Sequence, residues 1–149
     1  MARRRARELA FRALFEAERG GTPLKEVWCQ VRAEVFTGVS GDSAYGDALD
    51  EEALTFADRL LEAVVEHRVE IDREIESLVE GWSFSQMAQT DLNILRLAVA
   101  EMTHFVDIAP EVTIDVTVRI AKKYGGGDSG RFVNGVLARL YRDRLAPMG

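Results

Sequence analysis

Residues 3–17, RRRARELAFRALFEA, begin the chain with a pattern that predicts its fold class. On a helix that turns 100° per residue, the small and aliphatic side chains of this stretch fall within one arc of about 140°. They are Ala6, Leu9, Ala10, Ala13, Leu14 and Ala17. Such a stripe is typical of an amphipathic helix that packs against a core. The arginines therefore belong to a folded helix and not to a disordered arm.

Positive charge is concentrated in two blocks of an otherwise acidic chain. Residues 1–12 hold five arginines against one glutamate, and residues 119–144 hold seven basic side chains against two aspartates. Residues 13–118 hold seven basic against 22 acidic side chains, so the 149 residues have a formal net charge of −6. Phosphate contacts depend on local charge, and the two blocks predict binding to a polyanion. A solvated basic surface is the plain alternative.

Two phenylalanines accompany the arginines of the first block. Phe11 and Phe15 fall outside the aliphatic stripe, on the flank shared by Arg4, Arg12 and Arg19. Charges for phosphates and flat rings for bases suit single-stranded nucleic acid, where stacking contributes roughly 1–3 kcal/mol per base. We expect Phe11 to widen the core face of the helix instead, while Phe15 can serve either purpose.

The rest of the chain predicts further helices separated by short breaks. The apolar spacing indicates seven helices, at about 3–19, 23–36, 50–65, 70–80, 87–105, 110–124 and 130–144. Residues 37–49 are rich in glycine and are expected to form a mobile surface loop. The β-branched run at residues 112–118 would suit a strand, but a lone strand has no partner, so we expect a helix. The prediction is one all-α domain over residues 1–149, with helical subdomains at about 1–80 and 84–149.

Catalytic and metal chemistry find little support in the sequence. His67 and His104 lie 37 positions apart, with no carboxylate or cysteine at metal-ligand spacing, so we expect neither a metal nor a cofactor. Cys29, the single cysteine, suits a reducing compartment and is expected to pack as a small apolar group. No apolar run reaches the ~18–20 residues of a membrane span. The expectation is a cytoplasmic protein that is not an enzyme and does not enter a membrane.

The glycine-rich segment GGGDSG, residues 125–130, has cations on both sides. It lacks the Gly-Lys-Ser/Thr ending of a nucleotide-binding P-loop and follows a predicted helix, not a strand. A glycine-rich turn that opens onto a helix exposes backbone N–H groups, and Lys122, Lys123 and Arg131 stand beside this one. The segment predicts an anion site that suits an RNA phosphate, with a plain helix end as the alternative.

Four segments, in this order and spacing, resemble the NusB family of transcription antitermination factors. They are the arginine-rich opening at residues 3–8, LNILRLAVAEM at 92–102, the helix opened by Pro110, and IAKKYG at 120–125 with RFVNGVL at 131–137. The resemblance covers nearly the whole chain. Glycine costs a helix up to ~1 kcal/mol, so we expect Gly135 to allow a neighbouring helix to approach closely.

The resemblance implies an all-helical protein, without enzymatic activity or cofactor, that binds single-stranded boxA RNA. Proteins of this kind act as a heterodimer with NusE, a small-subunit ribosomal protein that joins the RNA polymerase elongation complex, and support antitermination in ribosomal RNA operons. The resemblance places a partner surface around Arg96 and Glu101, and the acidic middle of the chain suits a basic ribosomal protein. It places the RNA surface on Arg3, Arg4, Arg5, Arg7, Arg12, Phe15, Lys122, Lys123, Asp128, Arg131 and Phe132.

Two other functions stay open at this point. A similar helical domain is the RNA-binding part of some ribosomal RNA cytosine methyltransferases, which would need a cofactor-binding sheet for which the chain up to Gly149 has no room. The other alternative is a structural interaction protein, a homodimer whose arginines pair with its own acidic faces. RNA binding that weakens steeply with salt would separate an RNA-binding protein from this second alternative.

Overall fold

The computed structural model describes residues 2–37, 51–79, 81 and 83–145. Within these residues it consists of α-helices with short 3-10 and π turns, and it contains no β-strand. The predicted all-α fold is confirmed. The predicted loop at residues 37–49 lies outside the described residues, apart from Thr37, which ends a helix. Over the ranges described, none of the helices has the length and hydropathy required to cross a membrane.

The chain divides into two compact units, Met1–Glu62 and Ala63–Gly149, and the division falls inside the third helix. The sequence placed the junction between subdomains near residue 82 instead. The structure differs because the fourth helix packs against the fifth and sixth helices, which makes it part of the second unit.

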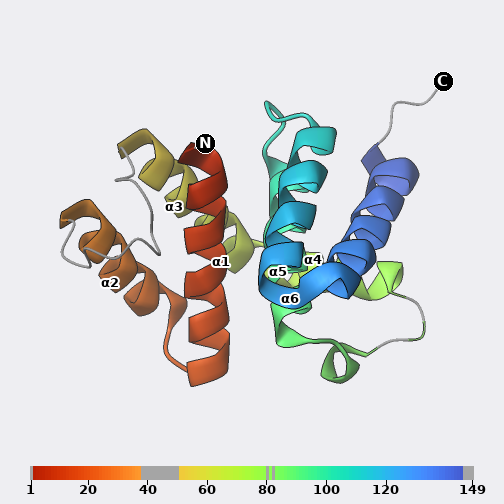
Figure 1. The fold of residues 1–149 in the computed structure, drawn as a ribbon, viewed down its shortest axis with the longest axis horizontal. Helices are drawn as coiled ribbons and strands as arrows, with labels where there is room; N and C mark the ends of the chain where they lie inside the picture. Colours follow the sequence, from red (N-terminus) through yellow and green to blue (C-terminus); the bar gives the residue numbers. More distant parts are fainter. Residues whose placement is uncertain (1, 38–50, 80, 82, 146–149) are drawn as a thin grey trace. The chain divides into compact units, whose positions relative to one another are not determined.

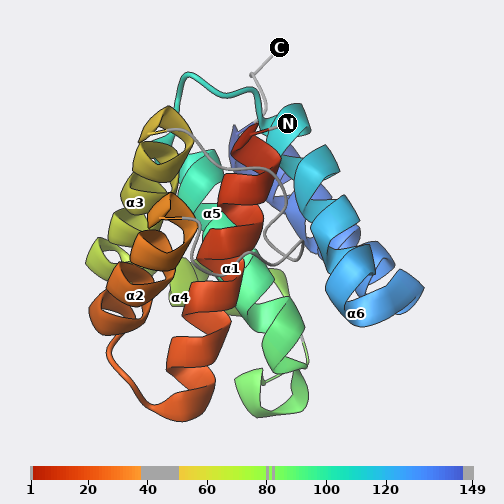
Figure 2. The same cartoon turned by 60° about the vertical axis from the view of Figure 1, so that its left-hand side comes forward.

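The first unit consists of α1 (Ala2–Gly20), α2 (Leu24–Thr37) and the larger part of α3 (Glu51–Glu66). Both α2 and α3 lie alongside α1 (Figures 1 and 2). All six side chains of the predicted stripe on α1 are buried, so the phase of this helix is confirmed. Gly21 has a φ of +71°, a conformation that favours glycine, and so the chain can turn from α1 into α2.

The prediction that Cys29 packs as an apolar group is wrong, because this side chain is exposed on α2. The buried face of α2 includes Val27, Trp28 and Val35, and helical phase places Cys29 away from it. Trp28 Nε1 donates a hydrogen bond to Asp58 Oδ1 at 2.6 Å, which joins α2 to α3. A buried indole with its N–H satisfied anchors this side of the first unit.

The second unit contains α4 (Arg68–Leu78), α5 (Gln89–His104) and α6 (Pro110–Leu140). A 3-10 turn at Phe84–Gln86 precedes α5, and a π turn at Tyr141–Leu145 follows α6. Every residue from Leu92 to Met102 on α5 is buried, including the polar or charged Asn93, Arg96 and Glu101. Accordingly α5 packs against both α4 and α6 (Figure 1).

The helices predicted before and after GGGDSG are both present and meet at a kink within α6, so counting them as one gives six α-helices in the described residues where seven were predicted. Only Gly126 departs from helical geometry within α6, with φ 88° and ψ −176°. This backbone region is open essentially to glycine alone, because a Cβ would clash there. The β-branched run at residues 112–118 is helical, as predicted.

The prediction that Gly135 serves a close helix contact is wrong. A Cβ built on Gly135 meets no atom within 4 Å. A Cβ on Gly130 would instead lie 2.5 Å from Lys122 Cγ, so it is Gly130 that allows a close approach. The space around Gly135 is open.

The two histidines, which the sequence gave no reason to associate, stack on each other in the second unit. Their ring centroids are 3.9 Å apart and the ring planes differ by 14°. His67 lies between α3 and α4, and His104 is the last residue of α5. The stack therefore connects the start of α4 to the end of α5. Within the described residues, no cluster of three or more His, Cys, Asp or Glu side chains could hold a metal ion.

We expect this stack to make the fold less stable below about pH 6.5. Burial, followed by the neighbouring His67, lowers the pKa of His104 from its usual 6.5, while Glu66 and Glu70 oppose this effect more weakly. The unfolded chain therefore takes up the proton at a higher pH than the folded chain does. Stability falls as the pH drops below 6.5 and levels off below the folded pKa.

Urea unfolding midpoints at about pH 7.5 and about pH 5.5 measure this difference in stability. His104→Gln removes the titrating ring and is expected to reduce the difference between the two midpoints. A variant that keeps the full pH dependence of the parent would show that other groups cause it.

Candidate nucleic-acid interface

The arginines of α1 divide between two flanks of the helix. The guanidinium carbons of Arg3 and Arg7 lie 5.0 and 5.1 Å from the ring centroid of Phe56 on α3. A guanidinium over an aromatic face is a favourable cation–π contact. Arg7 is only 7% exposed, so it helps hold the first unit together, whereas Arg3 remains exposed. Phe56 was not among the predicted site residues, because nothing in the sequence pattern of α3 indicates that this ring faces arginines.

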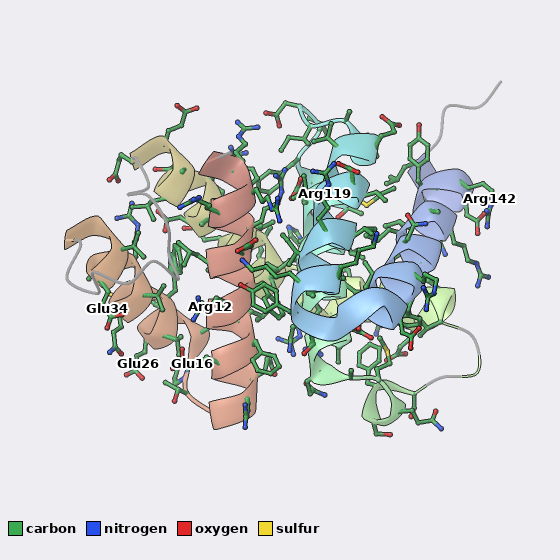
Figure 3. All side chains as sticks on the ribbon, in the orientation of Figure 1. Arg12, Glu16, Glu26, Glu34, Arg119 and Arg142 are labelled. Carbon is green, nitrogen blue, oxygen red and sulfur yellow. The ribbon has the colours of Figure 1, made fainter. Side chains whose placement is uncertain are left out.

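The other flank carries Arg4, Arg5, Arg12 and Phe15, which we call the α1 flank. Helical phase places these four side chains on the side of α1 away from its aliphatic stripe, and all four are partly exposed. Figure 3 shows Arg12 on α1. The Nε of Arg4 lies 3.6 Å from Glu8 Oε1, one turn further along the helix. The Arg4 side chain is 41% exposed and the contact is long, so Arg4 can still reach a phosphate.

The two phenylalanines of α1 differ in their exposure to solvent. Phe11 is buried, which confirms its predicted place in the core. The ring of Phe15 is partly exposed, and its centroid lies 5.8 Å from that of Phe11, with the planes tilted by 39°. The contact with a buried ring orients Phe15, and its exposed surface could stack on a base.

The second predicted block surrounds the irregular residue Gly126, and we call it the Gly126 bend. Lys122 and Lys123 are exposed before the bend, and Asp128 and Arg131 are exposed after it. An Nη of Arg131 donates to Asp128 Oδ1. The Nζ of Lys123 lies 5.5 Å from the ring centroid of Tyr124, its neighbour in the chain. The fifth predicted residue, Phe132, is partly exposed.

The Gly126 bend is tighter than the predicted turn. A Cβ on Gly125 would collide with the side chain of Ser129 and would lie 3.5 Å from Asp91 Oδ1 of α5. That Asp91 oxygen is buried and has no hydrogen-bond partner among the residues that the structure describes. A buried acceptor without a donor is unfavourable, so this oxygen lowers the stability of the second unit. The sequence analysis did not single out Asp91.

Arg96 and Glu101, predicted to touch a protein partner, are buried in the second unit. Arg96 is 5% exposed, and its Nε donates to Asp72 Oδ1 at 2.9 Å while an Nη donates to Asn93 Oδ1 at 2.9 Å. Glu101 is 2% exposed and accepts a hydrogen bond from Thr113 Oγ1 at 2.5 Å. Buried side chains bonded to their own chain cannot supply a partner surface, so direct contact does not fit the structure. Instead they connect α5 to α4 and α6.

Each predicted block is assembled within its own unit. The α1 flank belongs to the first unit, and the Gly126 bend belongs to the second. Both combine exposed cations with a partly exposed phenylalanine, a combination that suits phosphates and bases together.

Comparisons with known proteins give one consistent result. Residues 4–142 match the NusB family. A protein named transcription antitermination protein NusB from Deinococcus deserti is 50% identical over 144 residues, which is 94% of this chain and 80% of the relative. A protein of the same name from Thermus thermophilus is 51% identical over 141 residues, covering 94% of this chain and 90% of the relative.

Solved structures agree with these sequence relatives. NusB of T. maritima is 34% identical, with a TM-score of 0.79 over 97% of this chain and 93% of that structure. A structure of the antitermination factors NusB and NusE in complex with dsRNA is 29% identical, with a TM-score of 0.77, and the match covers 95% of this chain and 96% of that one.

Proposed function

The chain belongs to the NusB family, and from this we propose that it is a transcription antitermination factor that binds RNA together with NusE. Its RNA target is single-stranded boxA in nascent ribosomal RNA transcripts, and NusE connects it to the RNA polymerase elongation complex. It acts by binding and not by catalysis, in the cytoplasm where transcripts are made. The structural relative that holds NusE and dsRNA supports an RNA-bound heterodimer.

The observation that carries this proposal is the α1 flank. Three partly exposed arginines and Phe15 lie on one side of a folded helix, so the charges and the ring are held at fixed spacing. Arginines bind phosphates through charge-assisted hydrogen bonds, and an aromatic ring stacks on any base. The Gly126 bend offers a second set of the same kind, with exposed Lys122, Lys123 and Arg131 beside partly exposed Phe132. Each set by itself suits part of a short single strand.

NusE binding is proposed to use exposed acidic side chains of the second unit. Glu66, Glu70, Glu76, Asp107 and Glu111 are exposed there, and their charge suits a basic ribosomal protein. Arg96 and Glu101 contribute indirectly, by fixing α5 against its neighbours. A homodimer whose interface included the α1 flank would compete with RNA for the α1 flank.

A binding titration tests the proposal. Its arms are a single-stranded boxA 12-mer, a scrambled 12-mer and a boxA duplex, each with and without NusE, at two salt concentrations. We expect NusE to tighten binding, the boxA strand to bind more tightly than the scrambled strand, and log affinity to fall with log salt by about 0.7 per phosphate contacted. A mixture that binds none of the three RNAs, or all three equally, would contradict the proposal.

A further inference from the structure

The part of α6 that follows the Gly126 bend presents a basic face beyond the predicted RNA residues. Arg131, Asn134 and Gly135 of α6 and Arg142 of the π turn that continues it are exposed, and their spacing places them on one side. The side chains of Arg131 and Arg142 are 76% and 70% exposed. Figure 3 shows Arg142 extending outward from the end of this segment. We call these four residues the α6 outer face.

The charges around this face leave an excess of positive charge. Residues 131–145 contain four arginines and one acidic side chain, Asp143. Asp143 lies 3.5 Å from Arg139 and 3.4 Å from Arg142, so one carboxylate is shared between two guanidinium groups. Exposed pairs of this kind are weak, and Arg142 can exchange its partner for a phosphate.

Gly135, in the middle of the face, is not explained by packing within the chain. A glycine inside a helix costs up to ~1 kcal/mol relative to alanine. No atom lies within 4 Å of a Cβ at this position, so the described chain does not require the absence of a side chain. A glycine here instead leaves the helix backbone bare between two exposed arginines, where a ligand can approach closely.

We propose that bound RNA continues past the Gly126 bend along the α6 outer face, with Arg131 and Arg142 on its phosphates and Gly135 beneath the strand. The two arginines are separated by eleven residues, about 16 Å along the axis, so the strand spans more than one nucleotide. The inference rests on the proposed function, because it extends the same RNA surface. It also predicts that the additional nucleotides are bound through their phosphates. Contacts to phosphates carry no sequence information, so the additional nucleotides bind regardless of their bases.

The test compares a boxA 12-mer with the same strand extended by arbitrary nucleotides at its 5′ or its 3′ end, using the full chain with NusE. We expect one extension to tighten binding several-fold for the parent protein. Arg142→Ala should abolish this gain and lower the salt slope for the extended RNA by about 0.7, while leaving the 12-mer unaffected. Gly135→Leu should also reduce the gain, because its side chain occupies the face.

The chain offers a matched control in Arg144. This arginine has the same charge and lies two residues from Arg142, but it hydrogen-bonds to Glu74 of α4 at 2.9 Å. Arg144→Ala should therefore keep the gain from the extension. Thermal unfolding of Gly135→Leu is a second control, since the open space predicts no loss of stability.

Four outcomes would overturn the inference. An extension without effect, while the 12-mer binds, refutes it and leaves the proposed function intact. Equal losses in Arg142→Ala and Arg144→Ala would show that only net charge matters. If Gly135→Leu weakens NusE binding and leaves RNA binding unchanged, the face belongs to a protein partner. A parent protein that does not bind the 12-mer refutes the proposed function and this inference with it.

Discussion

Replacing Glu101 with lysine is expected to destabilise the fold by about 3–5 kcal/mol. The glutamate is almost completely buried and accepts the hydroxyl hydrogen bond of Thr113 from α6. A lysine at this position would place an unpaired positive charge in the core and leave the hydroxyl without its acceptor. A loss of this size is a large part of the roughly 5–15 kcal/mol that stabilises a typical domain.

Urea unfolding of Glu101→Lys and Glu101→Gln separates the effect of the side chain's charge on stability from the effect of its shape. The glutamine keeps an acceptor oxygen for Thr113 and nearly the same volume, so we expect it to cost much less than the lysine. NusE binding should weaken in Glu101→Lys only in proportion to the unfolded fraction. If the lysine variant is fully stable and still loses NusE binding, Glu101 contacts NusE directly, and the prediction is contradicted.

Replacing Arg4, Arg5 and Arg12 together with alanine is expected to weaken RNA binding by about 100-fold or more. Each arginine can form a charge-assisted hydrogen bond worth roughly 1.5–3 kcal/mol, part of which water replaces in the variant. Losing three phosphate contacts should also lower the salt slope by about 2. Because these side chains are partly exposed, the melting temperature should change little.

A matched control removes the same net charge elsewhere. Lys25, Arg59 and Arg73 are exposed and lie outside both basic blocks, so their triple alanine variant changes the total charge equally. We expect it to keep the salt slope of the parent. Similar losses in both triple variants would mean that RNA responds to the overall field of the protein and not to the α1 flank.

The helices could be predicted from the sequence because their burial follows a simple period. The stripe on α1 needed no knowledge of neighbouring helices. The bend in α6 was not predictable in the same way. The glycine run predicted a break between helices, but each of the three consecutive glycines could have adopted a positive φ, and the sequence does not show that Gly126 is the one that does.

The residues of the candidate site could be predicted from the sequence, but the burial and the contacts of each side chain could not. Charge counting identified both basic blocks, yet it could not show that Arg7 rests on Phe56 while Arg12 remains partly exposed. It also could not show that Arg96 and Glu101 face inward, because their hydrogen-bond partners Asp72 and Thr113 are distant in the sequence or on another helix. Contacts between separate helices determine whether such a side chain is buried or exposed.

The cation–π contact between Arg3 and Phe56 has a consequence for the entropy of binding. A free arginine on a surface samples many rotamers, and ordering such a side chain in a complex costs about 0.5–1.5 kcal/mol. The guanidinium of Arg3 is exposed, yet its position over the ring is set when the first unit folds. Part of its rotational freedom is therefore lost before any ligand arrives. Arg3 meets a polyanion as a preorganised charge, in contrast to a lysine, whose flexible stem would still have to be ordered.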